Sequence, residues 1–217
     1  MRVDPKIRKA VNTASFDQLK KWWLGEPPDW VESTIRFRHV LRKKIWELPE
    51  GIQFLKNYAR HGKGKRKFQA LVDLSNKKVA DDEVIHLLTK AFDSPDPAGK
   101  YGALMGLRRI KKFPLARQPV ESLMHNYETG WERDLAGLAF LYLVQAYPKE
   151  AAQTLSEGLE SPNHKIRMYA CDEIWTKGLF ELLPKVKKRI KDSNWNVSIA
   201  ARNCVDMLKI KQKDKSR

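Results

Sequence analysis

Apolar residues recur along this chain at helical spacing, with polar residues between them. Phe37, Leu41 and Ile45 form one stripe at i, i+4 and i+8, and a second stripe runs through residues 103–110. A 3.6-residue period of this kind predicts amphipathic helices. No segment sustains an alternation of apolar and polar residues, so we expect no β-strand.

A second pattern repeats at long range. A basic residue is followed three positions later by a small or helix-packing residue, and a final copy of the pattern has serine in place of the basic residue. The pairs are Arg36 with His39, Lys67 with Ala70, Lys100 with Ala103, Arg133 with Ala136, Arg167 with Ala170 and Ser198 with Ala201. Their second members are 31, 33, 33, 34 and 31 residues apart. A helical repeat of this length predicts an α-solenoid, in which each helix pair buries its apolar face by stacking on its neighbours.

The turns repeat with the helices. Asp96, Asn163 and Asn194 each stand four residues before the first member of a repeat pair, where a helix N-cap is expected. We predict an all-α chain with a single solenoid domain of about six antiparallel helix pairs over residues 15–209. Residues 1–14 form an N-terminal segment of low order in this interpretation, and residues 210–217 form a basic flexible tail.

The last repeats resemble a known family. Residues 166–170, Ile-Arg-Met-Tyr-Ala, follow a Ser-Pro-Asn turn and are similar to the V-R-x-x-A signature of HEAT repeats. Residues 197–201 repeat the signature with Ser198 in place of the arginine. The resemblance implies a HEAT-like fold over most of the chain. It also implies that Arg133 and Arg167 pair with neighbouring turns and are not ligand contacts.

The charge narrows the choice of partner. Lys and Arg number 42 against 26 Asp and Glu, a formal charge of +16, while 42% of the residues are apolar and can build a core. DNA, RNA and anionic membranes are the partners that such a surface attracts, although a basic protein without such a partner is the simpler alternative. No run of 18 apolar residues predicts a membrane span, and no continuous apolar segment suggests a secretory signal. Cys171 and Cys204 fall in apolar helical segments and are expected to be reduced, which indicates a cytoplasmic protein.

The basic residues form several clusters, which we interpret as the nucleic-acid contacts. The candidates are Arg38, Arg42, Lys43, Lys63, Lys65, Arg66, Lys67, Arg108, Arg109, Lys112, Lys187 and Lys188. The segment 61–67 is rich in glycine and lysine, and we expect it to be a turn that closes on a phosphate backbone. Each cluster could equally be a solvated helix face, or a set of cations that complements a helix C-terminus.

Catalysis is the second hypothesis. HEAT-repeat DNA glycosylases that excise alkylated bases are similar to this chain in length, charge and repeat number, and they use an aspartate beside aromatic residues. Asp134 near Trp131 and Asp172 near Trp175 are the candidates here, with the acids catalytic and the indoles stacking on bases. The acid spacing of the family is not reproduced, because Trp131 and Asp134 are three residues apart and not four.

Other chemistry has little support. The five histidines show no metal-ligand spacing, and neither a phosphate-cradling G-x-x-x-x-G-K-[ST] segment nor a G-x-S-x-G nucleophile motif occurs. We expect no metal and no cofactor. The three hypotheses are a nucleic-acid-binding module, an alkylated-base glycosylase, and a scaffold for an acidic protein partner, acting as a monomer or within a larger assembly.

Overall fold

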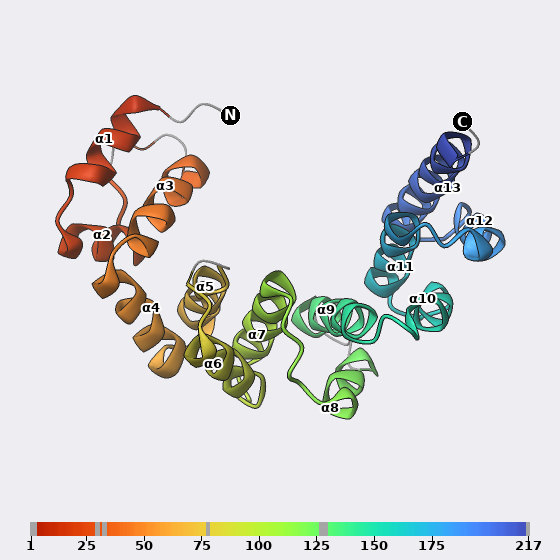
Figure 1. Cartoon of the computed structure of the whole chain (residues 1–217), viewed down its shortest axis with the longest axis horizontal. Coiled ribbons are helices and arrows are strands. Elements are labelled where there is room, and N and C mark those ends of the chain that lie inside the picture. The colour runs from red at the N-terminus through yellow and green to blue at the C-terminus, as the bar shows by residue number, and fades with distance from the viewer. Residues whose placement is uncertain (1–3, 29–30, 32–33, 77–78, 126–129, 216–217) are drawn as a thin grey trace. The chain divides into compact units, whose positions relative to one another are not determined.

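The computed structural model describes residues 4–28, 31, 34–76, 79–125 and 130–215 of the 217-residue chain. Within these ranges every regular element is a helix and no strand occurs, which confirms the all-α prediction (Figure 1). The chain divides into two compact units, Met1–Lys112 and Phe113–Arg217, where a single domain over residues 15–209 was expected. Each unit has its own packed interior and is described by itself.

Unit 1 is built from helix pairs that stack in sequence. Its helices are α1 (Pro5–Thr13), α2 (Phe16–Trp23), α3 (Thr34–Trp46), α4 (Pro49–His61), α5 (Gly64–Leu74), α6 (Asp82–Phe92) and α7 (Pro97–Ile110). Helix α4 packs on α6, and α5 packs on α7. Glycines allow a close approach of α7 to α5, since a Cβ atom on Gly102 would lie 3.0 Å from the side chain of Leu71.

Unit 2 follows the same rule. Its helices are α8 (Arg117–Ser122), α9 (Gly130–Ala146), α10 (Ala151–Leu159), α11 (His164–Lys177), α12 (Leu183–Arg189) and α13 (Trp195–Lys215), with short 3₁₀ turns η1 (Leu123–His125) and η2 (Phe180–Leu182). Helix α11 packs between α9 and α13, and α10 packs on α12. Cys171 and Cys204 are buried in this interior, and burial raises the pKa of their thiols to about 12 and about 11.

The sequence repeat marks one helix of each pair. Helices α5, α7, α9, α11 and α13 begin at intervals of 31 to 34 residues, which is the period of the repeat. The five repeat alanines are completely buried: Ala70, Ala103, Ala136, Ala170 and Ala201. No space is left around these side chains, so a larger side chain there would be overpacked. His39, which holds the same position in the first repeat, is exposed.

The three helix caps predicted from the sequence are present. The side chains of Asp96, Asn163 and Asn194 accept hydrogen bonds from the backbone N–H groups of Ala98, Lys165 and Asn196 respectively, at 3.0, 2.9 and 3.1 Å. Each bond satisfies one of the amide groups that the first helical turn leaves without an intrahelical acceptor.

The ends of the chain and one turn differ from expectation. Residues 5–13 are helical and not of low order, because Ile7 and Val11 bury their side chains. Helix α13 continues to Lys215, so residues 210–215 are helical where a flexible tail was predicted. The glycine-lysine turn is also shorter than predicted, since only Gly62 and Lys63 separate α4 from α5. No helix in the described ranges is long and apolar enough to cross a membrane.

Candidate functional site

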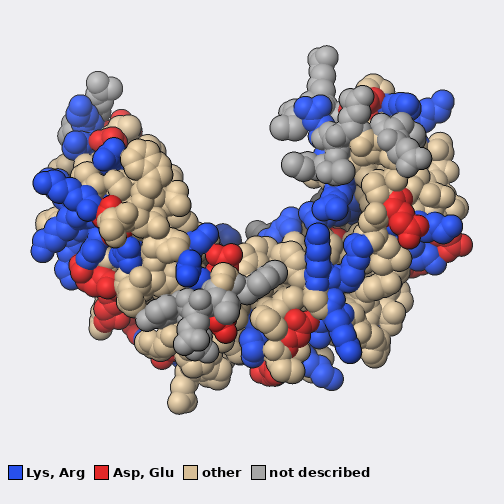
Figure 2. Space-filling model, turned by 180° about the vertical axis from the view of Figure 1, so that it is seen from behind, with Lys and Arg blue, Asp and Glu red and all other residues tan. Residues whose placement is uncertain are grey.

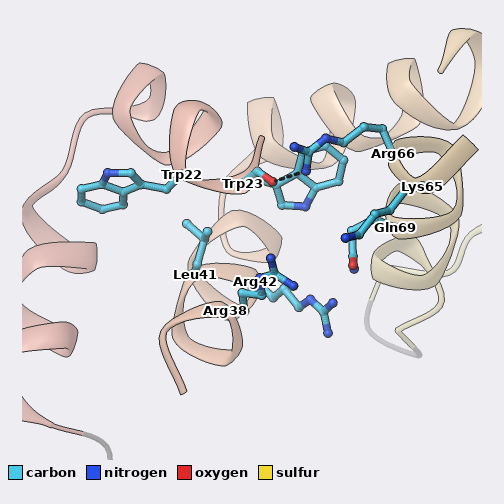
Figure 3. Close-up of a pocket in the computed structure, with 8 residues that line it drawn as sticks. All are labelled: Trp22, Trp23, Arg38, Leu41, Arg42, Lys65, Arg66 and Gln69. Atoms are coloured by element: carbon cyan, nitrogen blue, oxygen red, sulfur yellow. Dashed lines mark hydrogen bonds between the residues drawn. The ribbon is translucent and has the colours of Figure 1, made fainter. Parts of the chain in front are cut away.

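Four cations of unit 1 converge on one pocket. The residues that line it are Trp22 and Trp23 at the end of α2, Arg38, Leu41 and Arg42 on α3, and Lys65, Arg66 and Gln69 on α5. Half of these described lining residues are positively charged and none is negatively charged. The two cations of α3 and the two of α5 meet at the same pocket, where Arg42 of α3 reaches the Asp73 carboxylate of α5 (Figure 3).

A buried acid lies beneath the pocket. Asp73 is only 1% exposed, and its carboxylate accepts hydrogen bonds from the indole of Trp23 at 2.7 Å and from the amide of Gln69 at 2.8 Å. Arg42 Nε lies 2.8 Å from the same carboxylate. Burial raises the pKa of Asp73, and the charge of Arg42 and the two hydrogen bonds act against that rise. This acid therefore fixes both Arg42 and Trp23 in place.

Arg66 is fixed by α2. Its guanidinium donates a hydrogen bond to the backbone oxygen of Trp23 at 3.1 Å and lies over the Trp23 ring, 5.9 Å from the centroid. Figure 3 shows Arg66 reaching from α5 to Trp23, whereas the ring of Trp22 points away from the other side chains drawn. Gly25 lies next to this contact with φ at 104°, a conformation that favours glycine, and a Cβ atom there would lie 2.8 Å from Arg66 Nη2 and would displace the guanidinium.

The other two cations of the pocket are available. Arg38 and Lys65 are exposed, and neither charged group has a hydrogen-bond or ion-pair partner in the part of the chain that the structure describes. The free volume of the pocket is about 30 Å³, enough for one or two water molecules and too little for a nucleobase. The arrangement therefore suits an anion that rests at the mouth of the pocket.

Most of segment 61–67, which was expected to be a turn that closes on a phosphate backbone, is the first turn of α5, and its basic residues point to different faces of that helix. Successive residues on a helix point about 100° apart, and Lys67 accordingly faces a different pocket from Lys65 and Arg66. That pocket of about 560 Å³ also includes Arg60 and Lys90. The backbone N–H of Gly64 donates to the Asp96 carboxylate at 3.1 Å, so an acid from the next pair stabilises the basic first turn of α5.

The remaining basic candidates of unit 1 fall into two groups. Arg109, on α7, is exposed and lies close enough for its charge to lower the pKa of the Asp73 carboxyl. Lys43 instead lines a separate surface pocket with Arg8 and Lys44. The others are Lys63, which precedes α5, Arg108 in the last turn of α7, and the exposed Lys112.

Two further candidates lie on unit 2. Lys187 and Lys188 are exposed in the last turn of α12. Figure 2 shows Lys and Arg side chains gathered over the edge of unit 2 that carries α12, and a separate run of them over unit 1. The signature arginine of unit 2 is not part of this surface, because Arg167 forms a two-pronged pair with Asp192 at 2.8 and 2.9 Å. The HEAT resemblance implied this pairing for both signature arginines; the Arg133 guanidinium has no hydrogen-bond or ion-pair partner among the described residues, which do not include 126–129 of the turn before it.

The two candidate catalytic acids lie on adjacent helices of unit 2. Asp134, on α9, is 3.3 Å from the ammonium of Lys165. Asp172, on α11, is exposed at the surface, and partial desolvation of its carboxyl together with repulsion from Glu173 raises its pKa. Within the described residues no group of three His, Cys, Asp or Glu side chains could hold a metal ion.

The candidate stacking residues are placed differently from one another. The side chain of Trp131 lies outside the described part of the chain. Trp175 is half-buried, and the ammonium of Lys211 lies over its ring at 5.4 Å from the centroid. Among the tryptophans whose side chains the structure describes, Trp195 is the most exposed, and it was not among the stacking candidates predicted from the sequence. The signal was present, because Trp195 lies about 200° around the helix from Val197 and so faces away from the core stripe.

Comparison with known protein families and with curated proteins finds no match to this chain.

Proposed function

We propose that unit 1 binds the phosphate backbone of DNA or RNA through the pocket formed by α2, α3 and α5. The observation that carries the proposal is the convergence of Arg38, Arg42, Lys65 and Arg66 on one pocket whose described lining includes no acid. Coulomb attraction between such a cluster and phosphates requires no exact fit, which suits a ligand with a repeating charge.

Two of the four cations are held in place by protein contacts and two are available to a ligand, which supports the same function. Arg42 and Arg66 are fixed by Asp73 and by Trp23, so little side-chain entropy is lost when they meet an anion. Arg38 and Lys65 have no partner among the described residues and can adjust to the ligand. Arg109, on α7, adds a further positive charge close enough to act on Asp73. An extended anion fits this surface better than a single small one does.

We also propose that the helix pairs belong to a HEAT-like solenoid. The constant interval between α5, α7, α9, α11 and α13 and the stacking of alternate helices within each unit support this proposal. In such folds successive repeats present equivalent surfaces side by side, so a repeating polyanion can contact several of them.

The test is the salt dependence of binding. Fluorescence anisotropy with a labelled 20-base-pair DNA duplex, and with an RNA duplex of the same sequence, is measured between 50 and 300 mM salt. Each lost phosphate contact reduces the slope of log affinity against log salt by roughly 0.9, so the double variant Arg38→Gln/Lys65→Gln is expected to lose about 1.8 from the slope on DNA.

The matched control removes the same charge from unit 2. Lys149→Gln/Lys177→Gln lowers the net charge by two and is expected to leave the slope within about 0.5 of the wild-type value, because neither lysine is part of the unit 1 surface. Equal effects of the two double variants would show that only net charge matters and would contradict the proposal. Salt-insensitive binding, or none at 50 mM salt, would favour the acidic protein partner.

A further inference from the structure

Trp195 exposes most of its indole. It is 67% exposed, the largest exposed fraction among the large apolar side chains that the structure describes. Tryptophan rarely stays uncovered because its ring has a large apolar surface. In unit 1, by contrast, the indole N–H groups of Trp23 and Trp46 both bond to Asp73. The position of Trp195 therefore calls for a ligand that covers an aromatic face.

The backbone that carries this ring is held firmly. Asn194 caps α13 by accepting hydrogen bonds from Asn196 and Val197, and its own N–H donates to Asp192 at 3.0 Å. The hydroxyl of Ser198 donates to the backbone oxygen of Ile190 at 2.6 Å, which ties the first turn of α13 to the end of α12. The exposure of the indole is thus a property of an ordered turn and not of a frayed helix end.

Two lysines lie close to Trp195 in the sequence, and the acid nearest to it is paired. Lys188 and Lys191 are exposed, and their ammonium groups have no partner among the described side chains. Lys191 is four residues before Trp195, so their backbones are at most about 14 Å apart. Asp192, the acid nearest in sequence, is 3% exposed and is paired with Arg167. Figure 2 shows this edge of unit 2 covered by Lys and Arg.

The helix continues this surface. Arg202 is exposed and lies seven residues after Trp195, which places it on the same side of α13 and roughly 10 Å further along the axis. Ile199, between them, is partly exposed and offers an apolar contact. Asp206, one turn beyond Arg202, limits the anion-attracting stretch to the first two turns or so of the helix.

We propose that Trp195 is a stacking platform for an unpaired base of a nucleic acid, with Lys188, Lys191 and Arg202 contacting the adjacent phosphates. An aromatic face beside unpaired cations is the combination by which proteins bind single strands, because every base offers a face to stack on and the backbone carries the charge. The inference rests on the proposed nucleic-acid binding and adds the class of ligand: single-stranded DNA or RNA, or a duplex with unpaired bases. A duplex alone cannot use the ring, because its bases are already stacked on one another.

The experiment compares three 12-nucleotide probes at one salt concentration. They are a single strand of deoxyadenosines, a single strand of abasic nucleotides, which keeps the phosphates but lacks bases, and a blunt duplex. Stacking on one ring contributes about 1 to 3 kcal/mol, so Trp195→Ala is expected to weaken binding of the base-containing strand by about 5- to 150-fold. Affinity for the abasic strand and for the duplex should change by less than about twofold.

Two variants keep the result interpretable. Trp195→Phe retains a ring and is expected to recover most of the affinity for the deoxyadenosine strand. Ile210→Ala removes another exposed apolar side chain of α13 and should have no effect on any probe. Thermal unfolding of each variant checks that the fold is intact.

The outcomes separate this proposal from the one on which it rests. If Trp195→Ala leaves all three affinities unchanged, or lowers all three equally, the stacking platform is refuted while salt-dependent duplex binding by unit 1 stands. If the wild-type protein binds none of the probes, both proposals fail. If sedimentation shows that the wild type self-associates and Trp195→Ala abolishes this, the ring is a protein contact and the stacking proposal is overturned.

Discussion

The pair formed by Arg167 and Asp192 should stabilise unit 2 strongly. Arg167 Nε and Nη2 donate to the two carboxylate oxygens at 2.9 and 2.8 Å, and Nη1 donates to the backbone oxygens of Ser161 and Pro162 at 2.8 and 3.0 Å. The side chains are 12% and 3% exposed, so the pair is largely withdrawn from water. The perturbation is Arg167→Met, which keeps the side-chain length and removes the four hydrogen bonds.

The expected loss of stability depends on the partners that Asp192 keeps in the variant. Removing one partner of a buried ion pair costs about 3–5 kcal/mol, because the other charge stays buried without compensation. Asp192 retains the backbone N–H of Asn194 at 3.0 Å and the more distant Arg189 at 3.7 Å. We therefore expect the lower end of that range, about 3 kcal/mol of the free energy of unfolding of unit 2. For a unit of this size that loss lowers the melting temperature by on the order of 10 °C.

The assay must report on unit 2 alone, because two compact units can unfold separately. Hydrogen exchange of backbone amides in α11 and α13 provides this measurement, supported by thermal unfolding followed by circular dichroism. Arg133→Met is the matched control. Arg133 holds the same signature position one repeat earlier, yet its guanidinium has no hydrogen-bond or ion-pair partner among the described residues, so a change within about 0.5 kcal/mol is expected.

A double-mutant cycle completes the test. If the pair is the cause, Arg167→Met/Asp192→Asn should cost less than the two single variants added together, since removing both charges leaves neither one buried alone. A loss below about 1 kcal/mol in Arg167→Met would show that this pair does not stabilise unit 2 strongly. So would equal losses in Arg167→Met and Arg133→Met, because within the described residues Arg167 has a buried carboxylate partner and Arg133 has none.

Two further predictions concern packing and pH. Gly106→Ala should destabilise unit 1 by roughly 1–2 kcal/mol in urea unfolding, because the new Cβ would lie 2.3 Å from Ser75 Oγ and 2.6 Å from Leu88 Cδ2. The cost of this overlap exceeds the gain from the helical preference of alanine. Unchanged or higher stability would contradict the close contact. Burial acts to raise the pKa of Asp192, but the hydrogen bonds and charges of Arg167 and its neighbours hold it below its ordinary value of 3.8. The resulting stability is present above pH 3.8 and is lost as the pH falls through the folded-state pKa, so Asp192→Asn should be less stable at pH 7 and should lose less stability than the wild type on acidification to about pH 2.5.

The helices were predictable because their signals are local. Apolar spacing along one stripe, a cap residue before it and a small residue at each close contact need no knowledge of the rest of the chain. The stripe of Phe37, Leu41 and Ile45 is buried as predicted, and the repeat alanines are completely buried. The short turn before α5 was not predictable in this way. Its basic first turn looks unfavourable for a helix, and the acid that stabilises it, Asp96, lies 32 residues after Gly64.

The sequence predicted which cations belong to the candidate site, but it did not predict which of them share a pocket. Every cation of the unit 1 pocket was among the residues selected from the sequence, but nothing in the local pattern separates Lys65 and Arg66 from Lys67. Their separation depends on where the helix begins, because a shift of one residue would rotate each side chain by about 100°. The role of Asp73 was also hidden, since an acid on a helix is usually exposed and its partners come from α2 and α3.

Asp73 explains how four cations can share so small a pocket. Arginine and lysine side chains this close repel one another, and the folded unit would tend to splay them apart if no negative charge lay beneath them. Asp73 offsets part of this repulsion from below and, with 1% exposure, cannot itself occupy the mouth of the pocket. Because its carboxylate binds Arg42 through Nε, the two terminal nitrogens of that guanidinium have no acceptor among the described residues and can bind another one. A buried acid thus makes the cluster tolerable in the absence of ligand while leaving it attractive to phosphate.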